Sequence, residues 1–423
     1  GNVGDIRIDA TNVNLVRGSS LDIGTYNRGD TGNVVINARD SVTIDGELDR
    51  NRSHIFNIVA GPSAVGNAGD IEINTRRLSL TNGGSLNTTT YGRGNAGDIN
   101  IYASQSVILD GTSSNGNGSD LLSRVRGRVQ GNAGNISVTT PFFSMTNGAR
   151  AFNRTEGEGN AGNLTIVAED IQLSGSEIGS SVEASAKGRG GRIDLTADRV
   201  SLANLARITA NSAGQGDAGQ IFIHASDTVE LSNSTISTAV TGQGQGLGGS
   251  LNLEADSVSL RDRAFLTAET ASGRGGNIRL QLNHLLQMQG NSQITATAGT
   301  AGVGGDGGNI DIQSPLIVAL PEENSDITAN AFQGTGGNIS ITTQGLFGSE
   351  FRSAQTIESD ITASSQLGVS GTVAINNPIA NTSAGLVELA TTPSDPSKQV
   401  LVGCAAREGN SFTLTGRGGL PND

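Results

Sequence analysis

The chain repeats a pattern in which a glycine is followed, two and four residues later, by an aliphatic side chain. After Gly4 these are Ile6 and Ile8, and Ile, Leu or Val fills both positions in every copy. Apolar residues at every second position are typical of a β-strand that buries one face. The pattern starts at thirteen anchor glycines, which are Gly4, Gly32, Gly69, Gly97, Gly134, Gly162, Gly191, Gly219, Gly249, Gly276, Gly308, Gly337 and Gly371.

Two further short runs complete each copy of the repeat. The second run also alternates and begins about nine residues after the anchor, as in Val13 and Leu15, and it often ends in a turn such as TNGG. Asn and Gly supply the backbone conformations that such turns require. The third run is seen in SLNTTT (85–90) and DITASS (360–365), and a glycine-rich corner then leads to the next anchor.

The spacing of the anchors, 27 to 37 residues, is that of a solenoid repeat. Helical repeats of this length are excluded because the alternation has a period of two and β-branched residues dominate it. Three strands per coil, each stacked on its equivalent in the next coil, predict three parallel sheets. We therefore predict an all-β fold, a right-handed single-stranded parallel β-helix of about 13 three-strand coils that is roughly 60 Å long.

The repeat extends over residues 1–392, which we predict to be one β-helix domain. Its first anchor already stands at residue 4, so we expect the N-terminus to be truncated within a longer rod. Prolines in TTPSDPSK (391–398) then break the pattern. We predict that residues 393–423, which offer one or two short strands, form a capping tail over the open end of the core.

Two insertions interrupt the regular repeat. Coils two and four, counted from the anchors, are each 37 residues long, and their extra segments are 45–54 and 110–120. Both segments follow the second run, so they leave the solenoid at the same corner, and we expect them to form a local ridge. Loops on a rigid scaffold are a frequent place for binding, although tolerated surface insertions would look the same.

Composition and charge narrow the function classes. With 61 glycines and 35% hydrophobic residues, the chain suits a thin core along a rod better than a large round core. The net charge of −13 disfavours nucleic acid as a partner, because binding to phosphates needs cationic side chains. No stretch approaches the roughly 20 apolar residues that span a bilayer, so we do not expect a membrane-embedded protein, and no leader follows residue 1.

We expect no metal or other cofactor. The three histidines, His54, His224 and His284, stand in different coils, which disfavours a histidine-based metal site. The stretch GVGGDGGNIDI (302–312) is similar to a calcium-binding nonapeptide, but it occurs once and its glycines fit an ordinary corner. Cys404 is the only cysteine, so it forms no disulfide within the chain, and it is either structural filler or the site of intermolecular pairing.

The sequence gives little support to an enzyme. Polysaccharide lyases and hydrolases need two or three carboxylates and a basic residue that converge on one outer face. The chain has no Trp, and its few tyrosines, Tyr26, Tyr91 and Tyr102, offer no evident sugar platform. The outward carboxylates that we considered, without expecting them to form a catalytic site, are Asp70, Asp98, Asp194 and Glu254.

A column of hydroxyl residues runs through the third strands of six successive coils. We predict that it faces outward, so that Thr295→Asp is tolerated there while Ile223→Asp in the core is not. Side-chain hydrogen bonding within the stack explains such a column, and an ice-binding or glycan-binding face is the alternative. The column two residues further on is irregular, which disfavours ice binding. The hydroxyl column consists of Thr209, Ser237, Thr267, Thr295, Thr328 and Thr362.

The coil GNAGDIEINTRRLSLTNGGSLNTTTYGRG (66–94) and the ending GCAAREGNSFTLTGRGGLPND (403–423) carry a family resemblance. The chain resembles the filamentous-haemagglutinin-like exoproteins of two-partner secretion, especially the large cyanobacterial ones, over nearly all of its length. The resemblance implies export through an outer-membrane pore-type partner, folding on the outer surface, and a role in adhesion or aggregation. The family's N-terminal secretion domain is not in this sequence, and no functional residue carries over.

These observations together predict a secreted or cell-surface exoprotein, a rod-like stalk that mediates adhesion or aggregation. A glycan or a cell-surface molecule is the expected ligand, and repeated polar faces would bind it by weak multivalent contacts. Two alternatives remain open. One is a polysaccharide-active β-helix enzyme, recognisable by three or more acidic and basic side chains that meet in a groove on one sheet. The other is a passive surface-layer spacer without a ligand.

Overall fold

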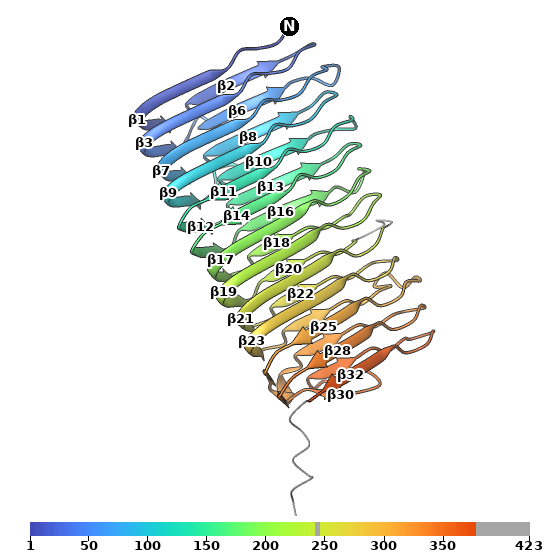
Figure 1. Cartoon of the computed structure of the whole chain (residues 1–423). Coiled ribbons are helices and arrows are strands. Elements are labelled where there is room, and N and C mark those ends of the chain that lie inside the picture. Colours follow the sequence, from blue (N-terminus) through green and yellow to red (C-terminus); the bar gives the residue numbers. More distant parts are fainter. Residues whose placement is uncertain (242–245, 378–423) are drawn as a thin grey trace, which may run out of the picture. The chain divides into compact units, whose positions relative to one another are not determined.

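Successive coils pair with each other as parallel strands in a computed structural model of the protein (Figure 1). The structure describes residues 1–241 and 246–377, which stack as a β-solenoid of about twelve turns. The prediction of an all-β parallel β-helix is therefore confirmed. The predicted capping tail 393–423, Cys404 and the predicted domain boundary at residue 392 lie outside the described residues.

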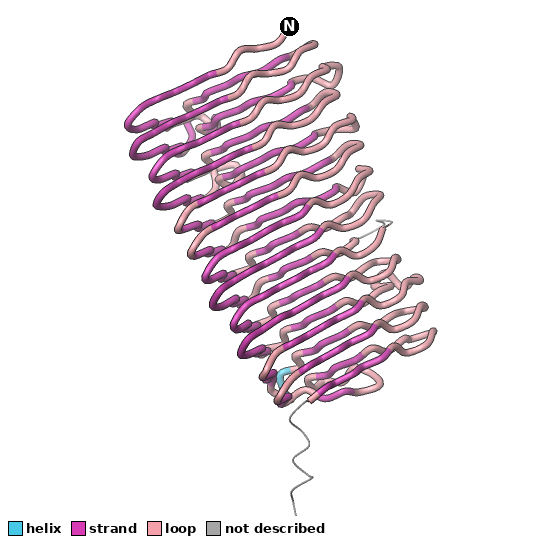
Figure 2. Tube along the Cα trace, viewed as in Figure 1, coloured by secondary structure: helices cyan, strands magenta, loops and turns pink. Residues whose placement is uncertain are grey.

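The first and second runs of the repeat lie in one sheet, which we call the first sheet. Figure 2 shows its strands side by side, with the loops gathered at the corners of the coils. Among the described residues this sheet has seventeen strands: β1 (Ile6–Val16), β3 (Val34–Asp45), β7 (Ile71–Thr81), β9 (Ile99–Asp110), β11 (Ile136–Thr139), β12 (Phe142–Thr146), β14 (Leu164–Val167), β15 (Asp170–Ser174), β17 (Arg192–Ala203), β19 (Gln220–Ser232), β21 (Ser250–Arg261), β23 (Asn277–Met288), β25 (Asn309–Gln313), β26 (Leu316–Ala319), β28 (Asn338–Thr342), β29 (Gly345–Phe347) and β32 (Thr372–Asn376).

The third run of each coil lies in a second sheet. Outside it, β4 (Glu47–Leu48) and β5 (Asn51–Arg52) form an antiparallel pair, and η1 (Pro321–Glu323) is a 3₁₀ turn. In the described part of the chain the second sheet has thirteen strands: β2 (Ser20–Thr25), β6 (His54–Val59), β8 (Ser85–Thr90), β10 (Asp120–Val125), β13 (Arg150–Thr155), β16 (Glu177–Val182), β18 (Arg207–Thr209), β20 (Thr235–Ser237), β22 (Phe265–Thr267), β24 (Gln293–Thr295), β27 (Asp326–Thr328), β31 (Asp360–Thr362) and β30 (Glu350–Phe351).

The prediction of three separate sheets is wrong in this respect, because the first two runs are halves of one bent strand in most coils. The register shifts by about one residue at the bend, as between Ala10 and Asn12 of β1. The bend thus absorbs small differences in coil length while both halves stay in phase. Where Pro141 or Pro315 occupies the bend, the strand is broken in two, because proline cannot donate a ladder hydrogen bond.

The predicted register of the anchors is confirmed. Ile6 lies opposite Val34, Val34 opposite Ile71, and the same column continues to the pairing of Ile339 with Val373. The inward residues of both sheets form one continuous apolar cluster along the stack, in which nearly every aliphatic side chain is fully buried. Each coil therefore buries its apolar face against the next coil and depends on it.

Only glycine fits at the anchor positions, because there is no room for a larger side chain. At each anchor from Gly32 to Gly371, a methyl group would overlap the backbone carbonyl group of the anchor one coil earlier. A second glycine column lies three residues before the anchors, as at Gly66 and Gly94. A methyl group at one of these positions would overlap the carbonyl group of the equivalent glycine one coil earlier. The repeat is thus Gly-x-x-Gly, and the sequence interpretation identified only the second glycine of each pair.

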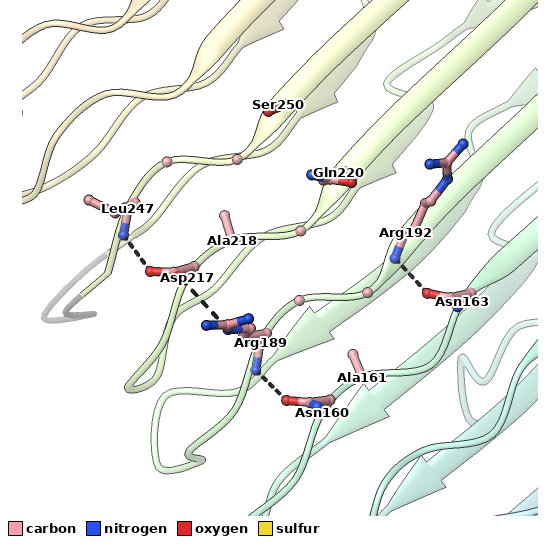
Figure 3. Close-up of a pocket in the computed structure, with 15 residues that line it drawn as sticks. Asn160, Ala161, Asn163, Arg189, Arg192, Asp217, Ala218, Gln220, Leu247 and Ser250 are labelled. Atoms are coloured by element: carbon pink, nitrogen blue, oxygen red, sulfur yellow. Dashed lines mark hydrogen bonds and ion pairs between the residues drawn. The ribbon is translucent and has the colours of Figure 1, made fainter.

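Asn and Asp residues that follow the two glycines tie each corner to the next coil. The side-chain oxygen of Asn67 accepts a hydrogen bond from the Asn95 amide, at 2.9 Å, and that of Asp70 accepts one from the Asp98 amide, at 2.7 Å. Both ladders run without a break from the first coil to the amides of Arg189 and Arg192, and Figure 3 shows the last hydrogen bond of each. They are interrupted there because an arginine side chain has no acceptor, and one ladder resumes where Asp217 accepts a hydrogen bond from the Leu247 amide at 3.0 Å. This explains the GNAGD motif.

The predicted hydroxyl column stacks as expected, but its exposure was predicted wrongly. Thr267 pairs with Thr295 and Thr295 with Thr328. Thr295 is only 4% exposed and donates a hydrogen bond to Glu269 at 2.8 Å. Burial raises the pKa of Glu269, and the hydrogen bonds from the hydroxyl groups of Thr295 and Thr267 oppose this rise. The short hydroxyl side chains are covered by longer neighbours, so Thr295→Asp is no longer expected to be harmless.

The described part of the chain contains no helix that is long and apolar enough to cross a membrane.

We predict that Gly219→Ala destabilises the stack, because the new methyl group would overlap the carbonyl oxygen of Gly191. The expected loss is about 1–3 kcal/mol of unfolding free energy. Gly4→Ala is the matched control, since no atom lies within 4 Å of a methyl group there and the change should cost less than ~0.5 kcal/mol. Urea unfolding followed by circular dichroism measures both, and equal losses would contradict the spatial role of the glycine column.

Ile223→Asp should destabilise the protein by about 4 kcal/mol or more, because it places an unpaired charge in the core between coils. Ile223 is 2% exposed. Gln313→Asp, at an exposed outward position of β25, is the appropriate control and should be tolerated. Thermal unfolding of the two variants tests the assignment of inward and outward faces, which would be wrong if the two melting temperatures fell together.

Candidate functional site

The two inserted loops meet over coil three, so the predicted ridge exists. In the loop 45–54, β4 and β5 form a short hairpin, and in the loop 110–120 an antiparallel bridge joins Thr112 to Gly118. The carboxylate of Glu47 accepts a hydrogen bond from the backbone amide of Ser114 at 3.0 Å. Two insertions 67 residues apart in sequence are thereby held together on one corner of the solenoid.

Arg52 fastens the first insertion to the coils that follow it. Its guanidinium donates to the carbonyl oxygens of Gly83 at 2.5 Å and Gly118 at 2.6 Å, and it forms an ion pair with Asp120 at 2.9 Å. The Asp120 side chain is almost fully buried and also accepts a hydrogen bond from Ser85. Burial raises the pKa of Asp120, while the charge of Arg52 and the Ser85 hydroxyl partly oppose that rise.

A groove lies below this ridge, on the outer face of the second sheet. It encloses about 190 Å³ and extends over β6, β8, β10 and β13. Its floor is a column of equivalent outward positions. In this column, the polar Asn87 stands between Phe56 on one side and Leu122 and Phe152 on the other. Four arginines and one aspartate provide its charge, and Asn87, Tyr91 and Asn117 add polar groups. The charged residues are Arg52, Arg124, Arg150, Arg154 and Asp120.

The stacking register explains why these arginines gather. Arg124 pairs with Arg154 on the neighbouring strand, and Asp120 pairs with Arg150 in the same way. The guanidinium of Arg154 lies 4.9 Å from the centre of the Phe152 ring and forms an ion pair with Glu183 at 3.0 Å. Arginines on adjacent strands are only about 4.8 Å apart along the stack, so the groove concentrates positive charge.

Two of the four arginines form no ion pair with a carboxylate in the part of the chain that the structure describes. Arg124 donates to the Thr89 hydroxyl at 3.3 Å and forms no ion pair within the described residues. Arg150 is exposed, and its side chain makes neither a hydrogen bond nor an ion pair with any part of the chain that the structure describes. The groove is therefore locally cationic on a chain whose net charge is −13.

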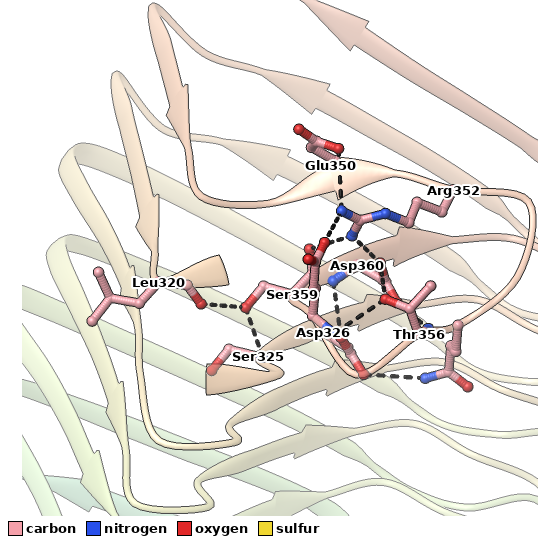
Figure 4. A network of polar contacts seen from close by, with 10 residues as sticks. Leu320, Ser325, Asp326, Glu350, Arg352, Thr356, Ser359 and Asp360 are labelled. Atoms are coloured by element: carbon pink, nitrogen blue, oxygen red, sulfur yellow. Dashed lines mark hydrogen bonds and ion pairs between the residues drawn. The ribbon is translucent and has the colours of Figure 1, made fainter. Parts of the chain in front are cut away.

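A third insertion, at residues 348–359, leaves coil twelve at the same corner and repeats this design (Figure 4). Arg352 forms ion pairs with Asp360, which is fully buried, and with Glu350 and Glu358. Asp360 occupies the position in β31 that Asp120 occupies in β10. At both places, therefore, an arginine from an inserted loop pairs with a buried aspartate at the start of a strand of the second sheet.

The neighbouring Asp326, one strand earlier in the stack, belongs to the same network. One of its oxygens accepts a hydrogen bond from the Asp360 amide at 2.9 Å, and the other accepts one from Gln355 at 3.2 Å. Burial raises the pKa of Asp326 above its ordinary value, and the adjacent Asp360 carboxylate adds to the rise. The carboxylates in this cluster are already engaged by the loop, so the cluster serves to anchor it.

The four carboxylates considered from sequence fall into two groups. Asp70 and Asp98 belong to the corner ladder, and burial raises the pKa of Asp70. Asp194 and Glu254 line one hollow of about 240 Å³ on the first sheet, together with Arg192 and His224. Arg192 pairs with Asp194 at 2.6 Å and His224 with Glu254 at 3.3 Å. Asp70 and Asp98 are thus neighbours in the stack, while Asp194 and Glu254 lie two strands apart, on β17 and β21, beside one hollow. The sequence predicted neither arrangement.

The corner beside the glycine columns is also hollowed, over about 590 Å³ next to Arg189 and Arg192 (Figure 3). Its floor is backbone, because the glycines there carry no side chains. Arg189 pairs with Asp217 at 3.8 Å and Arg192 with Asp194, so both arginines already have an acidic partner. This hollow therefore offers less unsatisfied charge than the groove on the second sheet.

The three histidines lie at separate places. His54 contacts Asp22 at 3.0 Å and stacks on Phe56, while His284 lies 3.7 Å from Asp256. Within the described residues, no group of three or more His, Cys, Asp and Glu side chains is arranged to hold a metal ion. In the stretch 302–312, Ile310 pairs with Ile278 in the ordinary phase of the first run.

The sequence interpretation missed the groove, because its residues are separated by about 30 positions and belong mainly to the third runs of four successive coils and to the two inserted loops. The signal was present in the third runs DLLSRV (120–125) and RAFNRT (150–155), where an arginine stands at the same place in two successive coils. Aligning the coils would have revealed that pair. The contribution of Arg52 from the inserted loop could not have been found in this way.

Comparison with protein-family models, with curated proteins and with solved structures finds no match.

We predict that Arg52→Met destabilises the protein by about 3–5 kcal/mol near neutral pH, because it leaves the buried Asp120 carboxylate unpaired. Arg50→Met, in the same loop but exposed, is the control. The raised pKa of Asp120 makes this deficit depend on pH. A buried carboxyl with a raised pKa takes up a proton as the pH falls, so the deficit should shrink on acidification.

Thermal unfolding at about pH 7 and about pH 4 measures this effect. Adding Asp120→Asn to Arg52→Met should restore part of the stability at neutral pH and remove most of the pH dependence. A deficit that is the same at both pH values, or the same in Arg50→Met, would contradict the role assigned to the ion pair.

Proposed function

We propose that the chain is a structural and adhesive exoprotein, a rigid stack of coils that carries a ligand-binding groove on its second sheet. The observation that carries the proposal is the groove below the joined insertions, where Arg124 and Arg150 form no ion pair in the described part of the chain. A cleft with an apolar floor and a few convergent polar groups is the usual form of a ligand site. Arginine forks and amide groups are suited to the hydroxyl and carboxylate groups of glycans.

We further propose that the protein is secreted and stays at the outer cell surface, after export through an outer-membrane pore-type partner. The support is the resemblance of the GNAGDI coils and of the ending GCAAREGNSFTLTGRGGLPND to exoproteins of two-partner secretion. A fold made of coils that stack one after another is compatible with such export, because each coil can form as it emerges and pack on the coil before it. Nucleic acid is not a proposed partner, given the net charge of −13.

A polysaccharide-active enzyme is the second candidate, and the hollow on the first sheet favours it. Asp194, Glu254, His224 and Arg192 line this hollow, and these residue types are the acids and bases that glycosidic chemistry needs. Against this candidate, the side chains of His224 and Glu254 are more than half exposed and pair with each other. Such pairs on exposed strands contribute little and are common.

The purified chain should be retained on immobilised polysaccharides without cleaving them. A panel of neutral and acidic polysaccharides, with retained protein quantified and soluble products analysed by mass spectrometry, measures both properties in the same wells. Retention without new products supports the adhesive function. Products that disappear in the Asp194→Asn/Glu254→Gln variant would replace the proposal with the enzyme, and a protein that is neither retained nor active would leave a passive surface-layer spacer.

A further inference from the structure

We propose that the groove on the second sheet binds a carboxylated polysaccharide, a polymer of uronic acids, through Arg124 and Arg150. This inference rests on the proposed function, since it names the ligand of the same groove. The site is the cationic hollow defined above by Arg52, Arg124, Arg150, Arg154 and Asp120, with a mainly apolar floor. If the groove binds a different ligand, the adhesive function can still hold.

The charges in the groove leave room for an acidic ligand. Arg52 is neutralised by Asp120 and Arg154 by Glu183. Arg124 and Arg150 remain, and each can present a planar fork of donors to a carboxylate. Arg150 stands between Asp120 and Glu177 in the register of the stack, but no ion pair joins it to either in the described structure. Two arginines without an ion-pair partner on an acidic protein favour an anionic ligand over a neutral one.

The geometry also favours a polymer over a single sugar. Arg150 lies at the first position of β13, and Arg124 at the fifth position of the adjacent strand β10. Four residues of strand separate the two positions by about 13 Å along the strand direction, in addition to the ~4.8 Å between the strands. A chain of several uronic acids that runs along the strands can therefore bring one carboxylate to each arginine. On the groove floor, Phe56 and Leu122 are partly exposed apolar side chains that suit the carbon faces of the sugar rings, while the Phe152 ring is buried beneath Arg154.

Carboxylates and phosphates both match the geometry of an arginine fork, so the number of contacts that the groove can make decides between them. The guanidinium group forms two parallel hydrogen bonds with a carboxylate, and these are about twice as strong as hydrogen bonds between neutral groups. Polynucleotides also carry anionic groups, but the groove offers few cationic contacts on a chain with net charge −13, and extended phosphate binding needs many of them. A short strand of DNA therefore tests whether the groove binds a polynucleotide instead.

The test compares Arg124→Gln/Arg150→Gln with the native chain. Binding to polygalacturonate, measured by biolayer interferometry at low and at physiological ionic strength, should weaken about tenfold or more in the variant, since two charge-assisted contacts are lost. Arg261→Gln/Arg279→Gln is the matched control. It removes two arginines from the first sheet, each of which pairs with an acidic residue, and should leave the affinity within about twofold of the native value.

Neutral dextran, dextran sulfate and single-stranded DNA complete the experiment, and circular dichroism confirms that each variant is folded. The native chain should bind polygalacturonate more tightly than any of these three. Equal binding of polygalacturonate by the native chain and the groove variant overturns the inference but leaves the adhesive function standing. Tighter binding of dextran, dextran sulfate or DNA also overturns it. A chain that binds no polysaccharide at all overturns the proposed function as well.

Discussion

The structure depends on the close approach of backbones at one corner of every coil. Two glycine columns pack there against the carbonyl groups of the preceding coil, with no space for a methyl group. Because this contact fixes the distance between coils, the strands that follow are held within hydrogen-bonding range and the aliphatic side chains stack in straight columns. Asn and Asp side chains reinforce the same corner by accepting the amide hydrogen bonds of the next coil. The core is thin, so its stability comes from repetition of this contact.

A corner fixed in this way cannot accommodate extra residues, and the longest insertions leave the solenoid elsewhere. The loops 45–54, 110–120 and 348–359 all follow the second run, where the chain turns toward the second sheet. Two of them carry an arginine that pairs with a buried aspartate of that sheet, Arg52 with Asp120 and Arg352 with Asp360. Such a pair ties a loop to the scaffold at one point. Beside the Arg52–Asp120 pair, the loops also form one side of a groove. The candidate binding site therefore lies where inserted loops interrupt the regular repeat.

The candidate site is built by register, which places residues about 30 positions apart on adjacent strands. Arg124 and Arg154 are neighbours for this reason, as are Asp120 and Arg150. The same principle places His224 beside Glu254 on the first sheet and Thr295 close to Glu269 on the second. Alternation along one strand gives the direction of a side chain, but its exposure depends on the side chains of the coils above and below. The direction of the Thr295 side chain could be deduced from the sequence, and it was predicted correctly. Its exposure to solvent could not be deduced, and it was predicted wrongly.

The sequence by itself determined the repeat, the strand phase and the parallel stacking, because a period of two between regularly spaced glycines is compatible with few other folds. It also located the insertions and their common corner, since their places within the repeat could be counted. The tertiary structure decided that the first two runs form one bent sheet, that the insertions meet, and that Arg52 closes a groove whose other arginines remain available. These features result from contacts between coils and between long side chains, and such contacts are determined by the packing of the whole stack and not by any local pattern in the chain.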